Sequence, residues 1–333
     1  MSKITFIGTG AFASALASTL SNNGHKVTMW GINEQEIDDI NKGFNSKYFG
    51  ERRFNKPRNV RATLNLEDAL YDSRYIILAV PSAAFSMVIP QIKAVLKDRK
   101  MNVINVAKGI DAKSKKFYSD VLKEEFGNNL KNVCTLVGPS FAIEVFDNQL
   151  TMVNIVGEKE TYLEKVAGLF KNNYFIATPC RDVYGAQLFA ALKNTFAIGL
   201  GIAKNIFPYK NPEAALLTLA IREINEIKNK YYPINKKVQS ATIDFSGIGD
   251  TFLTCTSTKS RNFSFGMKIY ELGIDKALNE NTTTIEGYRS ATIFYEYLKD
   301  DNEIQIPFLK NIFKVLFENK CPLELLDFLE TAF

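Results

Sequence analysis

The segment from Ile4 to Ala13 reads ITFIGTGAFA and decides the fold of the first half of the chain. A short apolar run leads into Gly8, and the residues after Gly10 have the spacing of a helix. In such a strand–turn–helix the first glycine allows the tight turn, and the second lets a pyrophosphate approach the main chain. The small Ala13 lets helix and strand pack closely, and the helix N-terminus offers N–H donors to an anion. The segment therefore predicts a Rossmann turn with Gly8, Gly10 and Ala13 as cofactor-binding residues.

Short apolar runs alternate with helical stretches through the first half of the chain. The runs typical of strands are residues 4–7, 26–30, 75–80, 102–106, 133–137, 152–156 and 174–177. Between them lie stretches with apolar residues at helical spacing, such as 11–20 and 85–96. This alternation predicts an α/β fold, a doubly wound and largely parallel sheet with helices on both faces.

The pattern changes after Arg181, where convincing strands disappear and the apolar period becomes helical. The predicted helices are residues 188–202, 214–228, 264–272, 292–298 and 308–317. A chain of 333 residues is also longer than one hydrophobic core usually organises. We therefore expect a dinucleotide-binding Rossmann-type domain at residues 1–182 and an all-helical substrate and catalytic domain at residues 183–333.

The composition is that of an ordinary globular protein, with 46% hydrophobic residues, 23% charged residues and a net charge of +5. The basic residues are not gathered into a long run, which disfavours a nucleic-acid partner. The cysteines stand far apart without metal-ligand spacing: they are Cys134, Cys180, Cys255 and Cys321. We therefore expect reduced, mostly buried thiols and no metal site.

The chain shows no signal-peptide pattern, because a strand is expected within three residues of Met1. The longest apolar helical stretch, residues 188–203, is interrupted by Lys193 and is expected to be too short to cross a bilayer. These features predict a cytoplasmic protein without stable membrane insertion.

The single histidine narrows the possible chemistry. His25 lies in a predicted turn after the first helix, where we expect a surface side chain. A Ser-His-Asp triad, a His acid–base pair and a His-rich zinc site are therefore excluded. A proton needed in catalysis must come from Lys, Asp, Glu, Tyr or Cys.

The end of the second predicted strand reads Trp30-Gly31-Ile32-Asn33. An Asp or Glu for NAD, or an Arg for NADP, is usual at this position, and neither is present. Asn33 could hydrogen-bond a ribose hydroxyl. Glu34 could help, or it could simply begin the next helix.

Two other segments follow predicted strands at the carboxyl edge of the sheet, where ligands of such folds bind. Lys108 follows one strand and precedes a glycine, so it could meet an anion or be an ordinary surface lysine. The segment from Gly138 to Ala142 follows another strand and opens a helix. It could form a second anion-binding N-terminus or a plain strand–turn–helix junction.

The helical half adds two polar clusters. Lys193 lies in an apolar helix, where it either reaches solvent or acts in proton transfer with a pKa lowered by desolvation. Glycines surround Asp250, and the Ser260-Arg261-Asn262 triplet follows it. Arginine supplies a bidentate fork for phosphate, although a capped helix junction with surface charges would show the same pattern.

Taken together, these motifs resemble the NAD(P)-dependent glycerol-3-phosphate dehydrogenases along nearly the whole chain. The motifs are IGTGAFASALA (7–17), VAKG (106–109), GPSFA (138–142), LKN (192–194), GIGDTFLTC (247–255), SRNFSFG (260–266) and EGY (286–288). The last four, in this order and spacing, are highly specific.

The resemblance implies a two-domain enzyme that reversibly reduces dihydroxyacetone phosphate to sn-glycerol 3-phosphate with NAD(P)H, supplying glycerophospholipid synthesis. It implies Lys193 as the proton donor and acceptor, with Lys108 and Asp250 beside the reacting centre. The implied substrate contacts are Lys108, Gly138, Ser140, Lys193, Asp250, Ser260, Arg261 and Asn262. The implied cofactor contacts are Ala11, Phe12, Tyr48, Lys108, Ala142, Arg261 and Glu286. A homodimer is expected from the resemblance alone.

Four positions depart from the family pattern. Ala13 replaces the third glycine, Phe12 replaces a usual tryptophan, and Ile143 stands where a lysine is common. Ile32 replaces the usual basic residue near the ribose, so we expect NAD to serve at least as well as NADP.

Three other functions remain open at this stage. A related two-domain dehydrogenase of 2-hydroxy or 2-keto acids would need the Ser260-Arg261-Asn262 triplet to bind a carboxylate. A redox sensor that binds NAD(P) without turnover would need the Gly8 turn but no proton donor. A nucleic-acid binder has only the net charge in its favour.

Overall fold

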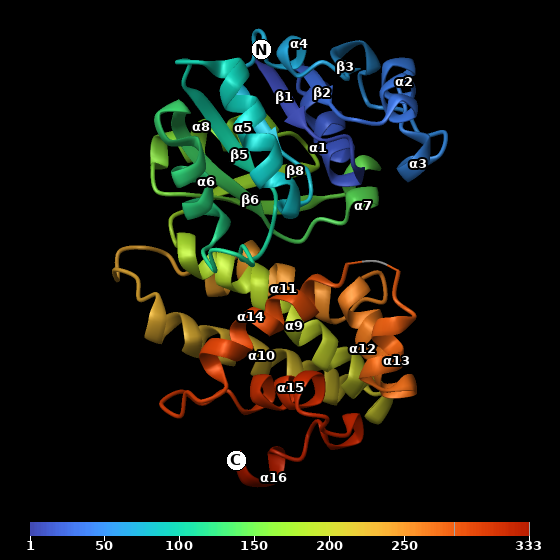
Figure 1. The fold of residues 1–333 in the computed structure, drawn as a ribbon, viewed down its shortest axis with the longest axis vertical. Helices are drawn as coiled ribbons and strands as arrows, with labels where there is room; N and C mark the ends of the chain where they lie inside the picture. Colours follow the sequence, from blue (N-terminus) through green and yellow to red (C-terminus); the bar gives the residue numbers. More distant parts are fainter. Residues whose placement is uncertain (283, 333) are drawn as a thin grey trace. The chain divides into compact units, whose positions relative to one another are not determined.

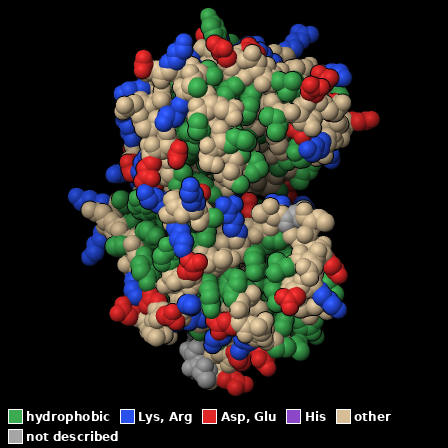
Figure 2. All heavy atoms as spheres, viewed as in Figure 1, with side chains coloured by type: hydrophobic (Ala, Val, Ile, Leu, Met, Phe, Trp, Pro, Cys, Tyr) green, Lys and Arg blue, Asp and Glu red, His purple; other side chains and the backbone are tan. Residues whose placement is uncertain are grey.

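The computed structural model describes residues 1–282 and 284–332, which form two compact units. Unit 1 consists of Met1–Asp111 and Lys116–Arg181, and unit 2 consists of Ala112–Lys115 and the chain from Asp182 onward. Charged side chains of both signs are distributed over the face drawn in Figure 2.

Unit 1 is built on a sheet in the order β3-β2-β1-β4-β5-β6-β7-β8. The strands are β1 (Lys3–Ile7), β2 (Lys26–Trp30), β3 (Val60–Thr63), β4 (Tyr75–Leu78), β5 (Met101–Asn105), β6 (Leu130–Val137), β7 (Thr151–Val156) and β8 (Phe175–Cys180). β6 and β7 pair antiparallel, and the other neighbouring strands are parallel. The predicted doubly wound, mostly parallel sheet is therefore confirmed (Figure 1).

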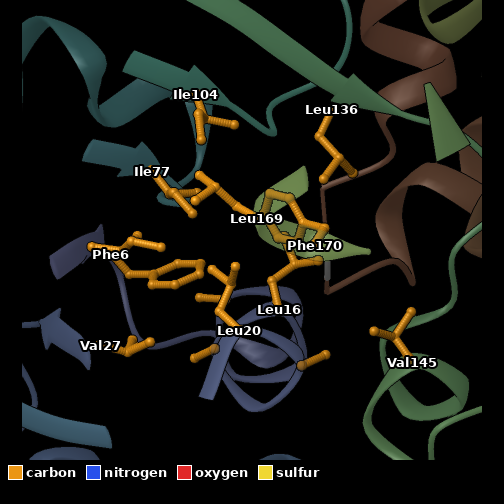
Figure 3. Close-up of a cluster of buried hydrophobic side chains, with 14 of the residues drawn as sticks. Phe6, Leu16, Leu20, Val27, Ile77, Ile104, Leu136, Val145, Leu169 and Phe170 are labelled. Carbon is orange, nitrogen blue, oxygen red and sulfur yellow. The ribbon is translucent and has the colours of Figure 1, made fainter. Parts of the chain in front are cut away.

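Helices cover both faces of this sheet. They are α1 (Ala11–Asn22), α2 (Glu34–Lys42), α3 (Ser46–Phe49), α4 (Leu66–Leu70), α5 (Phe85–Leu96), α6 (Tyr118–Phe126), α7 (Ala142–Phe146) and α8 (Glu160–Phe170). One buried cluster joins α1, α2, α7 and α8 to the sheet, and Figure 3 shows Leu16 and Leu20 of α1 beside Phe6 and Phe170. The second cluster joins α4, α5 and α6 to the opposite face. Burial of both faces explains why the strands are apolar runs.

Unit 2 is helical, as predicted. Its helices are α9 (Val183–Ile206), α10 (Lys210–Tyr231), α11 (Asp250–Cys255), α12 (Arg261–Leu272), α13 (Ile274–Asn279), α14 (Glu286–Leu298), α15 (Pro307–Phe317) and α16 (Leu329–Ala332). α9 is the central helix and contacts α10, α11, α12, α14 and α15. It crosses α12 so closely that a Cβ on Gly266 would lie 2.0 Å from the carbonyl oxygen of Ile198.

α9 corrects one interpretation of the sequence. The helix has 24 residues, so it is long and apolar enough to cross a membrane by length and composition, and the expectation that it is too short was wrong. Every residue of its apolar window is buried inside the protein. That environment is typical of the core helix of a soluble protein, in which Lys193 interrupts the apolar surface.

His25 also differs from the prediction, because it is buried rather than exposed. Its side chain is only 8% exposed, its Nδ1 accepts the main-chain N–H of Ser2 at 3.1 Å, and its Nε2 lies 3.2 Å from the carbonyl oxygen of Leu169. Burial lowers the pKa of this histidine below its usual value. His25 thus links the residue before β1 to Leu169 of α8. The cysteines are free as expected, and only Cys321 is exposed.

Candidate active site

The turn between β1 and α1 has the geometry that the sequence predicts for a nucleotide-binding turn. Gly8 has a φ of 119°, and a Cβ there would lie 2.7 Å from the carbonyl oxygen of Ala79, so only glycine fits. Gly10 is the N-cap of α1, and a Cβ at this position would meet nothing within 4 Å. The main chain at Gly10 is therefore open to an approaching ligand, while Ala13 is buried against the core.

Side chains from the segment after β2 form hydrogen bonds to this turn. The amide of Asn45 donates to the carbonyl oxygen of Thr9 at 2.9 Å and to Ser14 Oγ at 3.0 Å. Thr9 Oγ1 donates to Glu36 Oε2 at 2.5 Å, and Lys47 Nζ donates to Glu36 Oε1 at 2.6 Å. The sequence analysis missed Asn45, Glu36 and Lys47 as neighbours of the turn.

Asn33 has a structural role that the sequence interpretation did not assign. Its Oδ1 accepts the main-chain N–H of Glu36 at 3.0 Å, which makes Asn33 the N-cap of α2. Ile32 is 84% exposed, and Glu34 is the exposed first residue of the helix. The spacing Asn33-x-x-Glu36 matches a capping pattern and was the signal available to find Glu36.

The predicted aromatic and small cofactor residues lie around the same turn. Phe12 and Ala142 both pack against the hydrophobic cluster on the α1 side of the sheet. Tyr48 lies in α3 and is 37% exposed, with Lys47 Nζ 5.2 Å from its ring centroid. The next residue, Phe49, stacks on Phe146 of α7 at 3.9 Å, which anchors α3 to the unit.

The ends of β5 and β6 bring together three predicted residues. Lys108 Nζ lies 3.5 Å from the carbonyl oxygen of Gly138, and Ser140 Oγ donates to the same oxygen at 3.0 Å. Gly138 fits because a Cβ there would lie 2.8 Å from Val153 Cα. Buried Asn105 shapes the loop before Lys108, bonding both the N–H and the carbonyl oxygen of Ala107.

In unit 2, the structure pairs the two residues that the motifs singled out. Lys193 Nζ lies 2.6 Å from Asp250 Oδ1, and the two side chains are only 4% and 2% exposed. The ammonium also donates to Thr254 Oγ1 at 2.8 Å. Lys193 therefore does not reach solvent but is a buried, charge-paired lysine. Burial also raises the pKa of neighbouring Cys255 to about 12, so its thiol stays protonated.

The Ser260-Arg261-Asn262 triplet forms the start of α12. Ser260 Oγ accepts the main-chain N–H of Phe263 at 3.4 Å and caps the helix. Asn262 is buried, and it accepts the N–H of Gly287 at 2.9 Å while donating to Asn194 Oδ1 at 3.0 Å. Arg261 is exposed on the first turn.

Glu286, a predicted cofactor residue, belongs to the same cluster. It is the first residue of α14, and its Oε2 accepts from the amide of Asn194 at 3.5 Å. Asn194 thus joins Glu286 to Asn262. The structure therefore gathers Lys193, Asp250, Asn262 and Glu286 around α9.

A Rossmann-type unit with an open glycine turn, followed by a helical unit with a buried Lys–Asp pair, defines a two-domain, nicotinamide-dependent dehydrogenase. Family models give the particular family. The NAD-dependent glycerol-3-phosphate dehydrogenase N-terminus matches residues 3–163, and the corresponding C-terminus matches residues 182–327. The chain belongs to this family, whose members use NAD or NADP.

Individual relatives match over nearly the full length. The chain is 39% identical to glycerol-3-phosphate dehydrogenase [NAD(P)+] of Malacoplasma penetrans, with 96% of each chain covered. It is also 39% identical to the enzyme of that name from Mesoplasma florum, covering 97% of this chain and 96% of the relative. The crystal structure of glycerol-3-phosphate dehydrogenase from Coxiella burnetii matches with a TM-score of 0.84, at 25% identity and 99% coverage of both chains.

Proposed function

We propose that this protein catalyses the reversible reduction of dihydroxyacetone phosphate to sn-glycerol 3-phosphate with NADH or NADPH. The observation that carries the proposal is the buried ion pair between Lys193 and Asp250. This pair joins two of the motifs that carry the family resemblance, LKN (192–194) and GIGDTFLTC (247–255), which a protein that only bound the nucleotide would not need. The relatives named above bear the name of this activity.

The residues of unit 1 fit a nicotinamide dinucleotide. The open main chain at Gly10 and the absence of room for a side chain at Gly8 suit a pyrophosphate at the N-terminus of α1. The residues that would hold the cofactor are Gly8, Gly10, Ala11, Phe12, Ala13, Asn33, Tyr48, Lys108, Ala142, Arg261 and Glu286. When bound, the nicotinamide supplies or accepts the hydride. We assign nucleotide binding to residues 1–182 and substrate binding to residues 183–333.

Lys193 is the proposed proton donor. In the reducing direction its Nζ gives a proton to the carbonyl oxygen of the substrate, and in the oxidising direction it takes that proton back. The Asp250 carboxylate favours the protonated ammonium and orients it. Lys108 would stabilise the negative charge that develops on the same oxygen.

The phosphate of the substrate defines the remaining contacts. Arg261 is exposed at the start of α12, and its guanidinium can form two hydrogen bonds to phosphate. Gly138 and Ser140 next to Lys108, together with Ser260 and Asn262, complete the proposed substrate set. Because Ser260 and Asn262 also make structural bonds, Arg261 carries most of the charge recognition.

The family resemblance also suggests the biological setting of the enzyme. We propose a cytoplasmic homodimer that supplies glycerol 3-phosphate to phospholipid synthesis, with a small phosphorylated substrate as its partner. Analytical ultracentrifugation of the purified protein tests the dimer, and a monomer at micromolar concentration would contradict it.

A steady-state assay tests the activity directly. The purified protein is mixed with dihydroxyacetone phosphate and NADH or NADPH, and the loss of reduced nucleotide is followed. Turnover that depends on the phosphorylated ketone supports the proposal. Turnover only with 2-keto acids would show a related dehydrogenase, and nucleotide binding without turnover on any ketone would show a sensor.

A further inference from the structure

Next to the nucleotide turn lies a buried carboxylate that is not part of the dehydrogenase motifs. Glu36, in the first turn of α2, has a side chain only 9% exposed. Its Oε2 accepts the hydroxyl of Thr9 at 2.5 Å, and Thr9 lies between the two glycines of the turn. Burying a carboxylate is costly, so its place against the turn calls for a functional reason.

Rossmann folds usually have an acid close to this turn. That acid commonly follows β2 and hydrogen-bonds the ribose 2′-hydroxyl of NAD. Here β2 is followed by Gly31, and a Cβ on Gly31 would lie 2.7 Å from Thr9 Cγ2. Thr9 therefore contacts both the end of β2 and Glu36. Through Thr9, the carboxylate of Glu36 in α2 is thus a neighbour of the strand end that lacks an acid.

The partner of this carboxylate is exposed. Lys47 Nζ lies 2.6 Å from Glu36 Oε1, but the lysine side chain is 57% exposed. The hydrogen bond to Glu36 raises the pKa of Lys47, so the ammonium stays charged. Each carboxylate oxygen has two lone pairs, so Glu36 can accept a ligand hydroxyl while Lys47 stays beside it.

We propose that Glu36 is the ribose-binding carboxylate and that Glu36 and Lys47 together set the choice between NAD and NADP; this inference rests on the nucleotide binding, and not on the ketone reduction, of the proposed function. The Glu36 carboxylate accepts the ribose 2′-hydroxyl of NAD and repels the 2′-phosphate of NADP. Lys47 limits that repulsion by neutralising the carboxylate. Glu34, exposed and at the beginning of the same helix, has no part in the choice.

The test measures nucleotide binding without substrate or turnover. Dissociation constants for NADH and NADPH are determined by calorimetry, with the emission of Trp30, the single tryptophan, as a second signal. The wild type should bind NADH roughly ten- to a hundredfold more tightly than NADPH, the range expected for one charged hydrogen bond. Glu36→Gln should reduce this ratio about tenfold, mainly by weakening NADH.

Three further variants test whether the effect belongs to Glu36 and Lys47 or to their neighbours. Lys47→Met should weaken NADPH by about three- to tenfold and leave NADH within twofold, because it exposes the carboxylate charge. The matched control Glu34→Gln should leave both constants unchanged. If Glu36→Gln does not fold, Thr9→Val removes the hydroxyl that holds the carboxylate and should also reduce the ratio.

The outcomes are distinguishable. An unchanged ratio in Glu36→Gln, or an equal change in Glu34→Gln, overturns the assignment of Glu36. A gain in NADPH affinity in Lys47→Met overturns the role of Lys47. A wild type that binds both nucleotides but reduces no ketone contradicts the proposed function and leaves this inference standing.

Discussion

Helix α9 and its N-cap carry one member of each of two buried Lys–Asp pairs, and one of these pairs lies in the motifs of the dehydrogenase family. Asp182, the N-cap of α9, pairs with Lys228 of α10 at 3.2 Å, while Lys193 in the middle of α9 pairs with Asp250 of α11 at 2.6 Å. All four side chains are at most 4% exposed. Burial and charge pairing therefore do not by themselves distinguish a catalytic pair from a structural one.

The carboxylate of the Asp182 pair also binds main-chain groups. Asp182 also accepts the main-chain N–H groups of Gly185 at 3.0 Å and Ala241 at 2.9 Å. The Asp182 carboxylate thus connects the first turn of α9 to the segment at Ala241, and displacing it would leave these buried N–H groups without a hydrogen bond. The two ammonium groups are alike, because Lys193 binds side-chain oxygens of Asp250 and Thr254, and Lys228 binds those of Asp182 and Ser240. The two pairs differ in where they lie in the sequence, since Lys193 and Asp250 belong to the motifs LKN (192–194) and GIGDTFLTC (247–255), whereas Lys228 and Asp182 lie outside them.

The largest expected effect separates the two lysines by activity. Lys193→Met should lower kcat by roughly 10²–10⁴-fold, the usual contribution of a general acid. Lys228→Met should leave the kcat of the folded enzyme within a few-fold. Both substitutions leave a buried aspartate without its lysine, so each should cost about 3–5 kcal/mol of unfolding free energy.

The measurements are kcat from NADH oxidation and unfolding free energy from urea denaturation. Nucleotide binding by Lys193→Met, measured by calorimetry, serves as the control for an intact unit 1. Near-full kcat in Lys193→Met would remove that lysine from the mechanism. An equal loss of kcat in folded Lys228→Met would show that the two pairs are not different in kind.

The same contrast applies within the Ser260-Arg261-Asn262 triplet. Arg261→Ala should raise KM for dihydroxyacetone phosphate about ten- to a hundredfold, because a charged hydrogen bond to phosphate is lost. It should affect unphosphorylated dihydroxyacetone far less. Asn262→Ala should instead lower the unfolding free energy by about 1–3 kcal/mol, since the N–H of Gly287 and the side chain of Asn194 lose their partner.

These two variants are compared by KM on both ketones and by thermal unfolding. Equal losses of Arg261→Ala on both ketones would assign Arg261 to the cofactor or to the fold. An Asn262→Ala protein with native stability would contradict the structural role of its two hydrogen bonds.

Much of the fold could be predicted because each strand is a short apolar run. β3 was missed, since its four residues, VRAT, include an exposed arginine and its strand lies at the sheet edge. The antiparallel pairing of β6 and β7 could not be predicted either, because the spacing of apolar residues does not show in which direction neighbouring strands run. Buried His25 was misplaced for a related reason: its acceptor, Leu169, lies far away in the chain.

The sequence predicted those parts of the candidate site in which the functional residues stand close together in the chain. The glycine turn and the apolar setting of Lys193 are local, and both were found. Its pairing with Asp250 depends on how α9 and α11 pack. Asn33 shows that a local pattern can also be ambiguous. Its side chain suits both a ribose hydroxyl and a helix N-cap, and in the structure it caps α2.

The last expected effect concerns another buried carboxylate. Glu223 of α10 accepts the main-chain N–H groups of Phe308 and Leu309, each at 2.8 Å, at the start of α15. Like Asp182, Glu223 binds main-chain N–H groups of another segment. Burial raises the pKa of Glu223 from 4.5 to about 8 in spite of these bonds.

This pKa predicts how stability changes with pH. The folded protein binds more protons at Glu223 than the unfolded chain does between pH 4.5 and about 8. The contribution of Glu223 to stability is therefore fully present below pH 4.5 and is lost as pH rises through about 8, by at most about 1.4 kcal/mol per pH unit. Glu223→Gln does not titrate, so its unfolding free energy should fall less steeply than that of the wild type across this window. Urea denaturation at several pH values measures both slopes, and parallel curves would show that Glu223 is ionised throughout and held, like a cap, by its two N–H donors.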